Sequence, residues 1–239
     1  MDTDRDARMA ALRLVIRVLA VGLFCLGTVA WGGAFPWLLS ALRPQTALWT
    51  SFLGGAGVFL LLWGLWLSRR PGFWSILEHE LTHALFALLF FKRVYSLRVQ
   101  RRRGGAVTME SGNVVIALAP YFFPLLTVVL LVLKPLVRPG LNLIWSSLLG
   151  FSLAFHWTSL FQEFQFSQPD IRYAGRITSL STVVFFNLFF LGLTLAALPE
   201  HGRLVEEFLR IGLQNALQAG STFWSMLQQL VGSLISGSV

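Results

Sequence analysis

Residues 73–91 read FWSILEHELTHALFALLFF, an apolar stretch of nearly membrane-spanning length that contains the pattern H-E-x-x-H. His79 and His83 are one helical turn apart, so a helix places both imidazoles on one face. Such a pair can reach one tetrahedral zinc ion, with Glu80 beside it as a general base. Ionisable side chains are costly at membrane depth, which favours a functional metal site over the alternative, a structural polar cluster between helices.

The composition indicates an integral membrane protein. Of the 239 residues, 55% are hydrophobic and only 13% are charged, whereas a soluble domain carries about a quarter charged residues. The net charge of +8 does not predict nucleic-acid binding, because the basic residues flank apolar segments, where lipid headgroups would meet them. The single cysteine, Cys25, excludes a disulfide framework and is interpreted as a small core residue.

We predict an all-α polytopic membrane protein with about six transmembrane helices. The expected spans are residues 14–39, 47–68, 73–91, 114–133, 141–161 and 177–198, each close to the roughly 20 residues that cross a bilayer. The first span follows several arginines and is interpreted as a retained helix rather than a cleaved signal peptide. Basic residues fall on both predicted sides, so the positive-inside rule does not orient the chain.

Three regions follow from this division. Residues 1–72 hold two transmembrane helices, residues 73–198 form a membrane core around the H-E-x-x-H helix, and residues 199–239 form an amphipathic tail. The tail is expected to be one or two helices that lie on the membrane surface or bind a partner.

Residues 94–110 predict a β-hairpin inserted between the third and fourth spans. Apolar and polar residues alternate on both sides of Arg103-Gly104-Gly105, which is a turn signal. A basic interfacial loop is the alternative. A hairpin has an edge strand, and an edge strand can bind an extended peptide by strand addition.

Pro120 and Pro124 lie inside the expected fourth span. They predict a packing kink, because neighbouring helices can satisfy the carbonyls that a proline frees. The alternative is that Ala119-Pro120-Tyr121 opens backbone groups towards the active cavity.

A catalytic zinc site usually has three protein ligands and keeps one position for water. Asp170 lies just before the last span, near a membrane face, and is the favoured third ligand, with His156 and Glu163 as alternatives. Glu163 could instead pair with an arginine such as Arg172, and His156 could be a hydrogen-bonded histidine between helices. Glu78 could orient an imidazole through a hydrogen bond.

The motif in a membrane helix, the hairpin-like insertion and the later Asp together resemble the site-2 protease family of intramembrane zinc metalloproteases, in its small bacterial, peptidase-like branch. The resemblance covers roughly residues 73–198. It implies that His79, His83 and Asp170 bind Zn²⁺ and that Glu80 is the catalytic base. Departures are Thr82 in place of a small residue before the second His, and the lack of Asn-x-x-Pro and Leu-Asp-Gly motifs.

By this resemblance the chain would hydrolyse a peptide bond in or near a transmembrane segment, as a multi-pass protein of a bacterial inner membrane. Its expected partners are membrane lipids, a transmembrane protein substrate and a possible regulatory membrane partner. A catalytically inactive relative with a binding or regulatory role is the alternative. Four histidines are too few for a di-iron desaturase, and a transporter is disfavoured because no internal repeat is visible.

Overall fold

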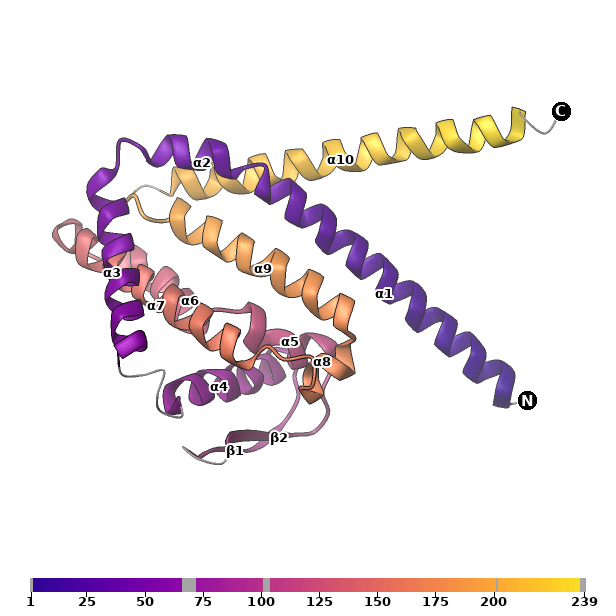
Figure 1. The fold of residues 1–239 in the computed structure, drawn as a ribbon, viewed down its shortest axis with the longest axis horizontal. Helices are drawn as coiled ribbons and strands as arrows, with labels where there is room; N and C mark the ends of the chain where they lie inside the picture. Colours follow the sequence, from indigo (N-terminus) through magenta and orange to yellow (C-terminus); the bar gives the residue numbers. More distant parts are fainter. Residues whose placement is uncertain (1, 66–71, 101–103, 201, 237–239) are drawn as a thin grey trace.

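The structure, a computed structural model, describes residues 2–65, 72–100, 104–200 and 202–236, and these are helical apart from one hairpin (Figure 1). In chain order the elements are α1 (Asp2–Gly32), α2 (Phe35–Leu42), α3 (Thr46–Leu65), α4 (Phe73–Leu89), β1 (Val94–Gln100), β2 (Gly104–Met109), α5 (Val114–Phe122), α6 (Leu125–Leu133), two 3₁₀ turns (Lys134–Leu136 and Pro139–Leu141), α7 (Asn142–Glu163), α8 (Pro169–Ala174), α9 (Arg176–Ala196) and α10 (Arg203–Ser236).

Four described segments are long and apolar enough to cross a membrane: Leu14–Leu42, Thr46–Leu65, Pro139–Glu163 and Arg176–Ala196. The pair α5 and α6 would make a fifth span, but it bends by 75° at its break. The predicted count of six is therefore not confirmed. The difference is α4, which has 17 residues, short of the roughly 20 that span the hydrocarbon core.

The end of α4 explains its length. Phe91 adopts a left-handed conformation with φ 56°, and the N–H of Lys92 donates to the carbonyl of Ala87 while that of Phe91 donates to Leu88. These two bonds form a Schellman motif, which stops a helix and turns the chain. The chain then enters β1, so the helix that carries the histidines is followed at once by the hairpin.

The hairpin is antiparallel and confirms the predicted insertion. Its register pairs Leu97 with Val107 and Val99 with Gly105. Both strands contact α4, so the sheet is held against the histidine helix rather than apart from the helical body (Figure 1).

Two glycines set the closest helix contact. A Cβ on Gly55 of α3 would lie 1.9 Å from the carbonyl oxygen of Ser147, and a Cβ on Gly150 of α7 would lie 1.9 Å from that of Phe52. The Ser147 hydroxyl also donates to the carbonyl of Ser51 at 3.0 Å. Small residues on facing helices allow this kind of backbone approach in membrane proteins.

The buried side chains form two clusters. One joins α2, α3, α7, α9 and α10 through residues such as Leu38, Leu149 and Phe208. The other joins α5, α8 and α9 through Leu118, Tyr121, Phe122, Ile171, Ala174 and Val183. The second cluster fixes the short helix α8 against α5, which places Asp170 for the site described next.

Candidate metal centre and active site

The two histidines of α4 point their Nε2 atoms at one another. These atoms are 3.2 Å apart, and the ring centroids are 4.8 Å apart at an interplanar angle of 72°. Both rings are largely shielded, since His83 is buried and His79 is half-buried. The helical spacing therefore brings both ring nitrogens to one point, as the sequence predicts.

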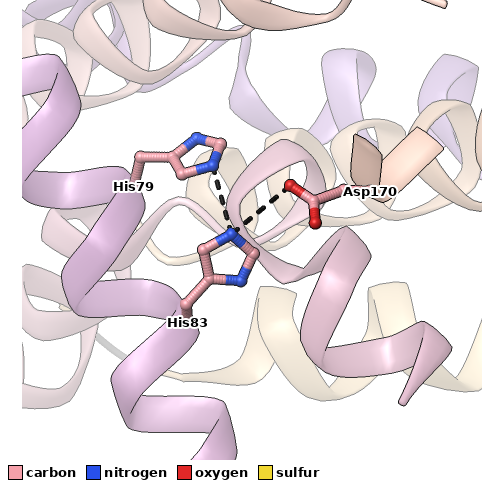
Figure 2. Close-up of side chains that lie close together, drawn as sticks. All are labelled: His79, His83 and Asp170. Carbon is pink, nitrogen blue, oxygen red and sulfur yellow. Dashed lines mark hydrogen bonds and ion pairs between the residues drawn. The ribbon is translucent and has the colours of Figure 1, made fainter. Parts of the chain in front are cut away.

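Asp170 reaches the same point from α8. Its Oδ2 lies 3.6 Å from Nε2 of His83, and the ligand atoms of the three residues all lie within 4.8 Å of one another. Figure 2 shows the carboxylate facing the two imidazoles from the opposite side. The neighbouring Ile171 is fully buried against α5 and α9, which holds Asp170 in this position.

The hydrogen bonds on the far side of each ring decide what the three residues can bind. Nδ1 of His79 lies 2.6 Å from Oε2 of Glu163, and Nδ1 of His83 lies 2.9 Å from the carbonyl oxygen of Ile116. Each acceptor requires a proton on Nδ1, so in the neutral tautomers both Nε2 atoms carry lone pairs. Two lone pairs and a carboxylate oxygen then converge and would repel one another unless a cation lay between them.

The spacing fits a zinc ion. A tetrahedral ion with bonds of about 2.0–2.2 Å separates its ligand atoms by about 3.3–3.6 Å. The separations of 3.2 Å between the two Nε2 atoms and 3.6 Å from His83 to Asp170 are close to this range, and all three ligand atoms lie within 4.8 Å of one another. The donor set of two imidazoles and one carboxylate suits zinc, and the bonds from Nδ1 to a carboxylate and a carbonyl are those that usually orient zinc-bound histidines. The residues present therefore fit this metal.

Pro120 leaves the Ile116 carbonyl free to accept a hydrogen bond from His83. In a regular helix the Ile116 carbonyl would accept from the N–H of residue 120, but proline has none. The freed carbonyl accepts from His83 instead, and the Asn113 side chain caps the start of the same helix by accepting from the Ile116 N–H at 2.8 Å. The predicted kink is also present, since α5 and α6 bend by 75° at the break next to Pro124. The freed backbone group that faces the site belongs to Ile116 and not to the Ala119-Pro120-Tyr121 stretch.

Glu80 lies beside the histidines, 8% exposed, and the hairpin covers it. A Cβ on Gly105 of β2 would lie 2.5 Å from Oε1 of Glu80, so only glycine allows the strand to run this close to the carboxylate. A cleft of about 500 Å³ opens here between α4, β2, α5 and α8. Glu80 and all three candidate ligands line it, with Val107 and Tyr173 among the other walls.

The other candidates for third ligand have different partners. His156 is 2% exposed and bonds through Nε2 to Oδ1 of Asn187 at 3.2 Å. It is therefore a hydrogen-bonded histidine between helices, which was the alternative to a ligand role. Glu163 binds Nδ1 of His79 and accepts a hydrogen bond from Ser75. Glu163 therefore orients the ring of His79 and is not one of the three residues whose ligand atoms converge.

Glu78 does not have the orienting role expected for it. Its Oε1 accepts from the N–H of Leu126 at 3.3 Å, at the start of α6, and Glu163 takes the orienting role.

Sequence reasoning also missed Tyr121, a fully buried residue whose ring packs edge-on against His79 with centroids 5.2 Å apart. The Ala119-Pro120-Tyr121 stretch had drawn attention to its backbone only.

Comparison with known proteins supports the family resemblance. Residues 53–162 match a family model described as Peptidase M50B-like. This match confirms the resemblance to the site-2 protease family. The matched region contains α4, the hairpin, α5, α6 and nearly all of α7, and it ends before Asp170. No curated protein and no solved structure matches the chain.

The family and the helices together give two conclusions. A peptidase family model over these residues supports a protease, and its site-2 protease membership with four long apolar helices indicates an integral membrane protein.

Proposed function

We propose that this chain is an intramembrane zinc metalloprotease that hydrolyses a peptide bond in or near a transmembrane segment. In this proposal His79, His83 and Asp170 hold the ion and Glu80 is the catalytic base. One observation carries it: two imidazole Nε2 atoms and a carboxylate oxygen converge beside a second carboxylate in an open cleft, while the Nδ1 atom of each ring bonds an acceptor on its far side. A purely structural cluster would pair donors with acceptors instead.

Each residue has a distinct task. The chemistry that a zinc ion would supply if held by these three residues is to lower the pKa of a coordinated water to about 7 and to polarise the scissile carbonyl. Glu80, on the cleft wall beside both histidines, accepts the proton from the attacking water and passes it to the leaving amine. Glu163 and the Ile116 carbonyl keep the two imidazoles in the tautomer that presents Nε2.

The hairpin provides a way to hold the substrate. Among the described residues the sheet has two strands, so β2 pairs with β1 along one edge and with no other described strand along the opposite edge. Gly105, Ala106 and Val107 of β2 line the cleft. An unwound substrate segment that added to the opposite edge of β2 would therefore pass beside Glu80, with its backbone held by the strand.

The metal content of the full chain in detergent tests this proposal. Wild type, purified without chelators, should hold about one zinc ion per chain. His83→Ala and Asp170→Asn should lose it. Gln168→Ala, in the same turn as Asp170, and His156→Gln should both keep it. Wild type without zinc would refute the proposal, and zinc retained in Asp170→Asn would refute the ligand set.

A further inference from the structure

The long C-terminal helix α10 has two chemically different halves. Its charged residues are all in the first turns: Arg203, Glu206, Glu207 and Arg210. From residue 211 to residue 236 the sequence IGLQNALQAGSTFWSMLQQLVGSLIS has no charged side chain.

The first half is docked onto the helical body. Phe208 is fully buried in the cluster that joins α2, α3, α7 and α9. Gly212 lets the helix approach Trp31, since a Cβ there would lie 2.5 Å from its Nε1. The Asn215 side chain donates to the Ala30 carbonyl of α1 at 2.9 Å. These contacts fix where the helix starts and which way it runs.

The second half diverges from α1 and runs away from the other helices, as Figure 1 shows at the yellow end of the chain. Phe223, Trp224 and Met226 are each about 60% exposed or more, at 67%, 59% and 62%. Apolar residues gather on one side, with Leu227 among them, while the other side is made of Gln218, Ser221, Thr222, Ser225 and Gln229. The helix is thus amphipathic, with an uncharged polar face.

The position of α10 in the chain says what its apolar side meets. The preceding helix α9 is a candidate span that ends at Ala196, so a short loop brings the chain back at a membrane face where α10 begins. Lys134 lies at the same end, with its ammonium group bonded to the Leu198 carbonyl at 2.8 Å. The rows of Gln and Ser would be costly in hydrocarbon, so the second half is unsuited to span the membrane.

We infer that residues 216–236 lie in the membrane–water interface, with the apolar side among the lipid chains and the Gln/Ser side in water. An exposed Trp beside the apolar stripe suits this depth. Because the polar side carries no charge, binding depends on buried apolar area and lipid packing, and not on anionic headgroups. This inference is independent of the catalytic proposal.

Spin labels on the full chain in vesicles of neutral phosphatidylcholine test the inference. A Cys25→Ser background removes the only native thiol. Phe223→Cys and Leu227→Cys place labels on the apolar side, and Ser225→Cys and Gln229→Cys are matched controls on the opposite side. We expect oxygen, which concentrates in lipid, to relax the first pair more, and a water-soluble nickel chelate to relax the second pair more.

The difference in oxygen and nickel access between the two pairs of labels should persist when anionic lipid is added. It should also persist in about 1 M salt, where the Debye length is only about 3 Å. Nickel access at all four positions would refute the inference in favour of a helix in water, and oxygen access at all four would indicate a span. Labels at 223 and 227 that are shielded from both reagents and broadened by one another would indicate a second copy of the chain. A contrast that appears only with anionic lipid would refute the uncharged mode of binding.

Discussion

Two polar clusters lie within the apolar helices of this protein, and they differ in how their atoms are matched. At the first, His79, His83 and Asp170 point three acceptors at one another across a cleft. At the second, Oδ1 of Asn187 faces Nε2 of His156 and accepts from Nε1 of Trp157, both at 3.2 Å, while Nδ2 donates to the Tyr121 carbonyl at 3.0 Å.

The second cluster is closed, because each donor has met an acceptor inside the protein. The first brings two ring nitrogens and a carboxylate oxygen together, and in our proposal a zinc ion lies between them. Both contain a buried histidine in a helix, so burial and residue type alone do not separate a binding site from a structural contact. The direction of the lone pairs separates the binding site from the structural contact.

Glu80→Gln should have the largest effect. The amide keeps the size of the side chain but cannot accept a proton, so cleavage of a transmembrane reporter peptide should fall by about 10³-fold or more. Zinc content, measured on the same preparation, should not change. Equal cleavage by wild type and variant would mean that Glu80 is not the base and would favour a non-catalytic relative.

Gly105→Val should be the next most harmful change. The new side chain would push on Glu80, and a displacement of about 1 Å in a catalytic group can cost about 10²-fold. The same substitution at Gly140, where a Cβ meets no atom within 4 Å and which lies outside the cleft, is the matched control. If both variants cleaved like wild type, the close approach of β2 to Glu80 would have no role.

Glu163→Gln tests whether the charge of Glu163 contributes to metal binding through His79. The amide can still accept from Nδ1 of His79 but without the charge, so zinc affinity in a chelator competition should fall by about 10- to 100-fold. Gln162→Ala, on the neighbouring position, should leave the affinity unchanged. A Glu163→Gln protein with wild-type affinity would show that this contact only packs the helices.

Pro120→Ala tests the freed carbonyl. Alanine restores a backbone N–H that competes with His83 for the Ile116 carbonyl, so we expect a loss of zinc affinity of about 10-fold, at the lower end of the range for such contacts. Removing a proline from a helix would otherwise raise thermal stability. Higher stability together with lower affinity is therefore the diagnostic pair, and unchanged affinity would contradict the role given to Pro120.

Asn187→Ala should have the smallest effect on the metal site and act on folding alone. It leaves the Trp157 N–H and the Tyr121 carbonyl without this partner, which should lower the stability by about 1 kcal/mol, seen as a lower midpoint of thermal unfolding in detergent. Zinc content should stay that of wild type. Zinc loss would show that the second cluster also supports the first.

Local patterns explain what the sequence could predict. The spacing of His79 and His83, the alternation in the hairpin and the place of Asp170 before α9 all follow from neighbouring residues. The bond from Glu163 to His79 joins residues 84 positions apart, so only the packing of α7 against α4 reveals it. The sequence places the end of the histidine helix at Phe91, two residues beyond the observed end at Leu89, because a Phe, rather than the usual Gly, takes the left-handed position.

The reciprocal glycines of α3 and α7 have a mechanical consequence. Each backbone is seated on the other at Gly55 and Gly150 with no side chain between them, so neither helix can slide or rotate without the two main chains colliding. The two helices therefore form a tightly packed pair. Glu163, at the end of α7, bonds His79 and so connects the histidine helix to this pair. In the proposed protease, we therefore expect the movement that admits a substrate on the hairpin side of the cleft and not at the contact between α3 and α7.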